Sequence, residues 1–170
     1  PPVRLGRLDE FIDRYRPAHR HSIRFVNGHW ISDYPVGAAL MAVPFYVPSV
    51  VFGVPPEPEH LERLEKVAAS GIVLLSALVM FATFRLVTDQ WISMLLTAIY
   101  AIGTSSLSTS SQALWQHGPG QLAIACALYC LIRGTSSPRW LALAGLALAV
   151  AVLCRPTNVL MAVPLAAYVL

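Results

Sequence analysis

The stretch Gln90–Ile132 decides the fold, and it reads QWISMLLTAIYAIGTSSLSTSSQALWQHGPGQLAIACALYCLI. It runs for 43 residues, a quarter of the chain, without one formal charge. A bilayer crossing needs about 20 consecutive, mostly apolar residues, so this stretch is long enough for two crossings. The joint between them is the polar but uncharged run Thr104–Gly120. The stretch therefore predicts a helical hairpin in lipid, and we expect part of the chemistry in its connection.

The composition of the whole chain is also that of a membrane protein. Hydrophobic residues make up 56% of the 170 residues, charged residues only 12%, and the mean hydropathy is +0.60, whereas soluble domains carry about 25% charged residues. The net charge of +3 does not indicate a nucleic-acid partner, because the basic residues are scattered and share no polar face. We expect an all-α, multi-spanning membrane protein. Because the sequence starts at Pro1 and stops within an apolar run, we also expect it to be a fragment of a longer protein.

The first 34 residues are polar and rich in arginine. Apolar residues at three- and four-residue spacing predict a short amphipathic helix at Leu5–Tyr15. Asn27-Gly28 lies between two short apolar runs, which predicts a β-hairpin over Ile23–Ile31. The next segment, Tyr34–Val54, is apolar but contains internal prolines. It therefore predicts either a kinked crossing or a broken juxtamembrane element that does not cross.

Further apolar segments follow an acidic loop at residues 55–66. They are Val67–Phe84, Trp91–Gly103 with an extension to Leu107, Gln121–Ile132 with a start near Leu114, Trp140–Leu153 and Thr157–Leu170. The chain therefore divides into three parts. Residues 1–34 form a loop with the amphipathic helix and the hairpin, residues 35–66 form a broken juxtamembrane segment and the acidic loop, and residues 67–170 form about five transmembrane helices.

The short loops predict an orientation. The loop that contains Arg133 and Arg139 has no acid, and positively charged loops favour the cytoplasm. If the segments from residue 67 onward each cross once, the Thr104–Gly120 connection and Arg155 lie on the opposite, extracytoplasmic side. The side of residues 1–34 stays open, because it depends on whether Tyr34–Val54 crosses.

Carboxylates near the N-terminus are candidates for general-base chemistry. Asp9 and Glu10 lie on the predicted amphipathic helix, where they form either a solvated face or a base that takes a proton from an acceptor. Asp33 precedes Tyr34 at the entry of an apolar segment. It is either a helix N-cap or a carboxylate of a site at the lipid interface, and Tyr34 joins it as a predicted substrate contact.

Residues near the extracytoplasmic ends of the later segments are candidates for substrate binding. Gln116 and His117 follow Trp115, an aromatic residue that favours the membrane interface, and His117 is either a helix cap or a group that handles a proton or contacts phosphate. Arg155 interrupts two apolar segments. It either snorkels to the headgroups or holds an anionic, lipid-linked substrate, since guanidinium binds phosphate through two hydrogen bonds.

Three strings of sequence carry a resemblance to a known family. They are NGHWISDYPVG at 27–37 followed by Ala38–Pro44, SQALWQHG at 111–118, and LCRPTN at 153–158. With these strings, in this order and spacing, the chain resembles bacterial multi-spanning glycosyltransferases of the GT-C class. It is close to the family that includes the dolichyl-phosphate-mannose protein mannosyltransferases and the lipopolysaccharide-modifying sugar transferases.

The resemblance implies a site and a topology. In that family the first long loop is extracytoplasmic, carries an acidic catalytic residue and contains juxtamembrane helices, which would place residues 1–34 outside. Asp9 and Glu10 match the family's early acidic pair, although an acid upstream of Pro1 could take that role. The family's donors are sugars on a polyprenyl phosphate, and its basic residues near the outer leaflet contact that phosphate, which fits Arg155. Many relatives carry an acid near the position of His117.

We therefore expect a hexosyl- or pentosyltransferase of the bacterial inner membrane. It would transfer a sugar from a polyprenyl-phosphate donor to a lipid, glycan or protein acceptor on the extracytoplasmic face. The bilayer and the donor are its expected partners; no cofactor or metal site is predicted from the residues, although a divalent cation could assist. The alternatives are a transporter or flippase-like protein, which would carry broken helices and charges at mid-membrane, and a scaffold without activity.

Overall fold

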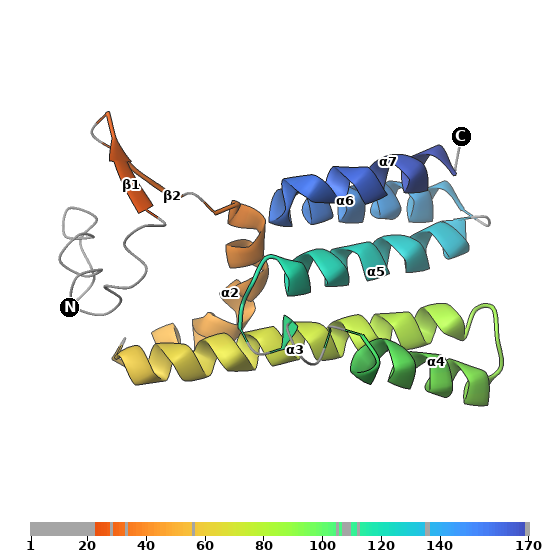
Figure 1. Ribbon diagram of the computed structural model, residues 1–170, viewed down its shortest axis with the longest axis horizontal. Helices are drawn as coiled ribbons and strands as arrows, with labels where there is room; N and C mark the ends of the chain where they lie inside the picture. Colours follow the sequence, from red (N-terminus) through yellow and green to blue (C-terminus); the bar gives the residue numbers. More distant parts are fainter. Residues whose placement is uncertain are drawn as a thin grey trace.

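The computed structural model describes residues 23–27, 29–32, 34–55, 57–104, 106, 110–111, 113–134 and 137–168. Its elements, in chain order (Figure 1), are β1 (Ile23–Val26), β2 (His29–Ser32), α2 (Val36–Val51), α3 (Pro58–Phe84), α4 (Gln90–Ile102), α5 (His117–Gly134), α6 (Pro138–Cys154), the 3-10 turn η4 (Pro156–Asn158) and α7 (Val159–Ala167). The expected helical class is confirmed. The helix predicted at Leu5–Tyr15 lies outside the described residues.

The N-terminal hairpin is the one sheet among the described residues. β1 and β2 pair antiparallel, with Phe25 opposite Trp30 and Val26 opposite His29. Asn27 has a φ of 50°, the left-handed conformation that a two-residue hairpin turn requires and that asparagine tolerates. The hairpin predicted from the Asn27-Gly28 pair is thus present.

Helix α3 combines a charged start with a long apolar body. Pro58 opens the helix and Glu59 stands in its first turn, where the free amides favour a negative charge. Among the described residues, the part Glu59–Phe84 is the one helix long and apolar enough to cross a membrane, by length and composition. The other apolar helices, α2, α4, α6 and η4–α7, are shorter.

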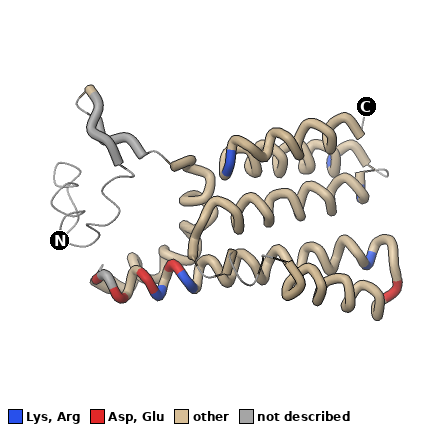
Figure 2. The backbone as a smooth tube through the Cα atoms, in the orientation of Figure 1, with Lys and Arg blue, Asp and Glu red and all other residues tan. Residues whose placement is uncertain are grey.

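The helices alternate in direction, so their connections gather at two ends. In Figure 1, α3 and α5 run the same way and α4 and α6 run back. The turn with Arg85 and Asp89 and the loop between Arg133 and Arg139 therefore share one end, and Figure 2 shows charges there and at the start of α3. The sequence predicted that these two loops lie at the same end.

Asp89 caps α4 by accepting hydrogen bonds from the amides of Trp91 and Ile92, at 2.8 and 3.2 Å.

Helix α2 shows that the apolar segment Tyr34–Val54 is kinked within one helix rather than broken into separate helices. Both Pro44 and Pro48 lie inside a single helix of 16 residues. The prolines remove two backbone donors, and Figure 1 shows that the ribbon bends along its course rather than stopping. The helix is held by packing at both halves, because Gly37 contacts the backbone at Leu153 and the ring of Phe45 covers Gly71.

The connection between α4 and α5 differs most from expectation. Helix α4 ends at Ile102 with Gly103 as its cap, so the predicted extension to Leu107 is wrong, and α5 begins at His117 rather than near Leu114. Ser106, Ser110 and Ser111 within the connection are buried. Ser106 and Ser110 have π-helical geometry, and the amide of Ser111 donates to the carbonyl oxygen of Ser106 at 3.1 Å.

Packing between α5 and α6 uses small side chains. Ala123, Ala127 and Cys130 of α5 and Ala144 and Ala151 of α6 are buried. Leu131 and Leu148 are buried with them, but many large apolar side chains of the helices are exposed, for example Leu74, Leu78, Leu143, Leu146 and Leu160. Small residues inside and large apolar residues outside are typical of helices that pack against one another in lipid.

Candidate functional site

A cavity of about 470 Å³ lies between α4 and α5 and opens near the junction of α6 with η4. It is lined by Met80 of α3, Tyr100 of α4, Thr104 and Ser110 of the connection, His117, Gln121, Ile124, Ala125 and Leu128 of α5, and Arg155 and Asn158 of the α6–η4 junction. Residues from five parts of the chain thus meet there. The size is within the range of small-ligand sites, about 300–1,000 Å³.

One edge of the cavity, which we call its mouth, carries two solvent-accessible basic side chains that are joined by a hydrogen bond. Arg155 Nη1 lies 2.9 Å from His117 Nδ1. A guanidinium can only donate, so the imidazole nitrogen accepts and carries no proton in this arrangement. Among the described residues no carboxylate forms an ion pair with Arg155. Its remaining N–H groups can donate to an anion.

Local sequence explains why both side chains reach the mouth. Arg155 has extended backbone angles, φ −153° and ψ 113°, which end α6 before Pro156 starts the next turn. His117 is the first residue of α5, and its ring stacks on Trp115 with 6.3 Å between ring centroids. The start of a helix offers free amides that suit an anion. A positive side chain and a helix N-terminus therefore lie together.

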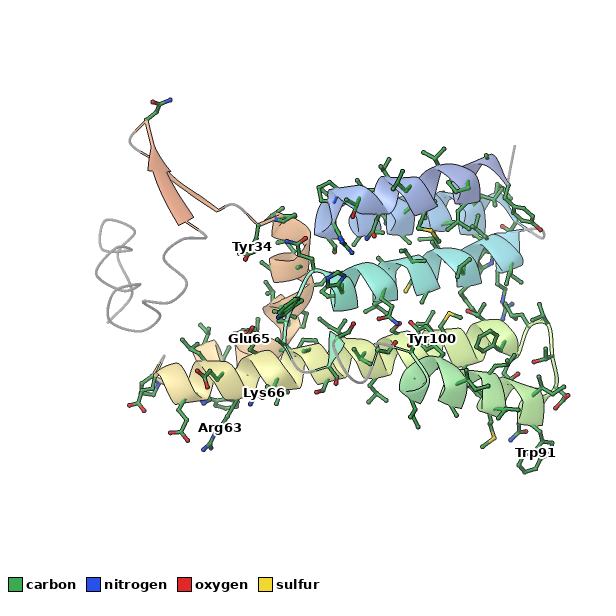
Figure 3. The ribbon with its side chains drawn as sticks, viewed as in Figure 1. Tyr34, Arg63, Glu65, Lys66, Trp91 and Tyr100 are labelled. Atoms are coloured by element: carbon green, nitrogen blue, oxygen red, sulfur yellow. The ribbon has the colours of Figure 1, made fainter. Side chains whose placement is uncertain are left out.

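Below the mouth, the polar groups of the cavity are neutral. Gln121 Nε2 donates to Ser106 Oγ at 2.5 Å, and Ser106 Oγ lies 2.8 Å from Thr104 Oγ1. Tyr100, labelled in Figure 3, has its hydroxyl 2.5 Å from Ser76 Oγ of α3. Hydroxyls and one amide can orient a ligand by hydrogen bonds, but they neither attract nor repel a charge strongly.

The remaining wall of the cavity is apolar. Met80, Ile124, Ala125 and Leu128 line it, and the last three follow His117 and Gln121 along one stripe of α5 at helical spacing. The stripe changes from polar at the start of the helix to apolar further along. Chemically, the cavity suits an amphiphilic molecule with one anionic group and an apolar chain.

The structure brings together some of the residues predicted from sequence. His117 and Arg155 are in direct contact. Gln116 lies just before α5, where its carbonyl oxygen accepts from the amide of Gly120 at 3.2 Å, and it does not line the cavity. Tyr34 is exposed beside the start of α2 and is also absent from the lining. Asp9, Glu10 and Asp33 lie outside the described residues.

Other lining residues were missed by sequence reasoning. They are Tyr100, Thr104, Ser110, Gln121 and Asn158. Gln121 carried a usable signal, because an amide one helical turn after His117 in an apolar helix lies on the same face. Asn158 stood in the LCRPTN string but was given no role. Among the described residues, no group of three or more His, Cys, Asp or Glu side chains could hold a metal ion.

Taken together, the exposed apolar helix faces and the anion-compatible cavity define a helical membrane protein that can hold an amphiphilic anion. A family model described as dolichyl-phosphate-mannose-protein mannosyltransferase matches residues 67–170, which include every residue that lines the cavity. The chain belongs to this family. The match supports, in general terms, a membrane glycosyltransferase that depends on a polyprenyl-phosphate sugar. No curated protein and no solved structure matches the chain.

Proposed function

We propose that the protein transfers a sugar from a polyprenyl-phosphate donor to a lipid, glycan or protein acceptor at the extracytoplasmic face of the bacterial inner membrane. The observation that carries this proposal is the Arg155–His117 pair, at the mouth of a cavity whose inner wall is apolar. Family membership supports the donor class. A polyprenyl phosphate would place its phosphate at the mouth and its isoprenoid chain along Met80, Ile124 and Leu128, so its anionic and apolar parts would each meet a matching part of the cavity.

In the proposed reaction, the bond between the anomeric carbon and the donor phosphate oxygen breaks, and the acceptor hydroxyl oxygen bonds to that carbon. The bonding electrons stay on the phosphate, so its charge rises from about −1 to about −2. Arg155 stabilises this added charge, because a guanidinium binds two phosphate oxygens at once. The proton of the acceptor hydroxyl goes to a carboxylate of the N-terminal loop, for which Asp9 and Glu10 are our candidates.

The proposed topology is multi-pass, with the cavity mouth outside. Trp91 and Trp140 stand in the first turns of α4 and α6, at the end where α3 and α5 finish, and Trp115 lies just before the start of α5. Figure 3 shows Trp91 at the start of α4, at the opposite end of the helices from Arg63 on the first turns of α3. Aromatic residues at both ends fit two membrane interfaces, and the basic loop at Arg133 fits the cytoplasmic one.

The alternative of a transporter has one feature in its favour, the buried connection after α4, where the α-helix gives way to π-type geometry at Ser106 and Ser110. Transporters place ion and substrate sites at such breaks. The polar side chains around this connection, Thr104, Ser106 and Gln121, are all neutral. The cation Arg155 lies at the end of α6 rather than at the middle of a helix. The arrangement therefore favours a phosphate held at one face over an ion held at mid-membrane.

Exchange of Arg155 tests the proposal. In the full-length protein, in membranes, Arg155→Ala should raise the half-saturating donor concentration by roughly a hundredfold, and Arg155→Lys by less, because lysine keeps the charge but loses the planar fork. Arg139→Ala, at the other end of α6, is the matched control and should leave donor use unchanged. Unchanged donor dependence in a membrane-inserted Arg155→Ala protein would exclude the proposed role.

A further inference from the structure

We propose that Gly120 and Asn158, with Gly37 on the opposite side, are positioning residues that fix Arg155 at the cavity mouth. This inference rests on the proposed function, because it explains how the phosphate-binding guanidinium is held. The segment concerned is Cys154–Asn158, which connects α6 to α7. An arginine in a short irregular connection has many orientations open to it, so its aim depends on what packs against the backbone beside it.

Gly37 closes one side of this segment. A Cβ atom built on Gly37 would lie 2.5 Å from the backbone nitrogen of Cys154 and 2.5 Å from the carbonyl carbon of Leu153. Backbone atoms cannot rotate away as a side-chain end can. Only glycine lets α2 approach the last residues of α6 this closely, and Cys154 is fully buried as a result, with its sulfur 3.5 Å from the sulfur of Met41.

Gly120 closes the other side. A Cβ atom built there would lie 2.6 Å from Nδ2 of Asn158 and 4.0 Å from Cβ of Cys154. The Asn158 amide cannot simply swing aside, because it donates a hydrogen bond of 2.8 Å to the carbonyl oxygen of Ala151 in the last turn of α6. This bond ties η4 back onto α6 across the position of Arg155. Close packing therefore fixes the relative positions of three elements: the first turn of α5, the end of α6 and η4.

The close packing of α5 against α6 and η4 has a direct consequence for the cavity mouth. Gly120 belongs to the same first turn of α5 that carries His117, and Asn158 belongs to the same junction that carries Arg155. The close approach of Gly120 to Asn158 sets the separation of the two elements, and the Arg155–His117 distance of 2.9 Å follows from that separation. A methyl group at position 120 would push the elements apart and draw the guanidinium away from the donor phosphate.

A double-mutant cycle distinguishes positioning from general stability. The full-length protein is compared with Gly120→Ala, Arg155→Ala and the double variant, by the half-saturating concentration of donor, by turnover at saturation and by binding of farnesyl phosphate as a probe. Gly120→Ala alone should raise the half-saturating concentration roughly tenfold or more, as small misplacements do, and should also lower turnover at saturation, because Arg155 stabilises the leaving phosphate as well. In the Arg155→Ala background it should add less than twofold, because the group that it misplaces is gone.

Two further variants keep the test decisive. Gly145→Ala is the matched control, since a Cβ there meets nothing within 4 Å, and it should behave as wild type. If Gly120→Ala protein does not reach the membrane, Asn158→Ala, which removes the bond to Ala151 without a clash, takes its place in the cycle. If Gly120→Ala or Asn158→Ala weakens donor binding equally with and without Arg155, the positioning role alone is overturned. If the Arg155→Ala protein binds the donor normally, the proposed function itself is overturned.

Discussion

Arg155 and His117 are joined by a hydrogen bond of 2.9 Å, although 38 positions of sequence separate them. The bond joins two strings of the chain that sequence reasoning noticed separately, SQALWQHG at 111–118 and LCRPTN at 153–158. Its direction is fixed, because the guanidinium is always the donor. We propose that His117 supports Arg155 before the donor arrives and serves as a second contact for the phosphate afterwards.

Substitution of His117 should separate these two roles. We expect His117→Ala to raise the half-saturating donor concentration roughly tenfold, because the charge-assisted bond to Arg155 is lost. His117→Asn should cost less, since its amide oxygen can accept the same bond. The measurement is transfer of labelled sugar at varied donor concentration. Equal, full activity of both variants would show that Arg155 needs no support from this position.

Removal of the candidate base should affect turnover rather than donor binding. Asp9→Asn or Glu10→Gln should reduce the turnover number by roughly a hundredfold or more, the contribution usual for a general base. Expression and farnesyl phosphate binding serve as controls and should stay normal. If both single variants transfer sugar at the wild-type rate, the base lies elsewhere in the protein.

The topology can be read by cysteine labelling in a background without Cys126, Cys130 and Cys154. An impermeant thiol reagent applied to intact cells should label a cysteine at Trp115 but not one at Arg139, because the two lie at opposite ends of the bundle and both are exposed. Both should be labelled once the cells are opened. The reverse pattern in intact cells would invert the proposed orientation.

The contact of α2 with α6 should be a large local contribution to stability. Gly37→Ala should lower the free energy of unfolding by roughly 1–3 kcal/mol, the usual cost of overpacking, because its methyl group would meet the backbone at Leu153 and Cys154. Thermal unfolding in detergent measures this, with Gly145→Ala as the paired control in α6. A melting temperature equal to that of the control would mean that α2 can move away without loss.

Hydropathy predicted most of the helices because it acts locally. The apolar bodies of α3, α4 and α6 stand close to where the sequence placed them, since Pro58, Asp89 and Pro138 mark their starts by short-range chemistry. The sequence predicted the region around Pro44 and the connection after Gly103 less accurately. A proline weakens a helix by an amount that packing elsewhere can offset, and that packing, here on Gly71 by Phe45, is invisible in the segment itself.

The candidate site was predictable mainly in its two basic residues. Arg155 and His117 stand out in apolar surroundings, and a charge or imidazole in such a place indicates function. Tyr100 is an ordinary polar residue whose neighbours indicate no cavity. Thr104 is one of many polar residues in the connection where chemistry is expected, and Gln121 is marked only by its place one helical turn after His117. Their roles follow from contacts between α3, the connection and α5, which hydropathy and spacing do not encode.

The tight contacts at Gly37 and Gly120 should lead to different patterns of substitution among related sequences. At Gly120 the obstacle is the end of a side chain, so a lineage that gains a methyl group there can compensate with a smaller residue at Asn158, and the two positions should change together. At Gly37 the obstacle is the backbone of Leu153 and Cys154, which every residue type shares. No partner substitution can make room, so position 37 should stay glycine in every descendant that keeps this junction.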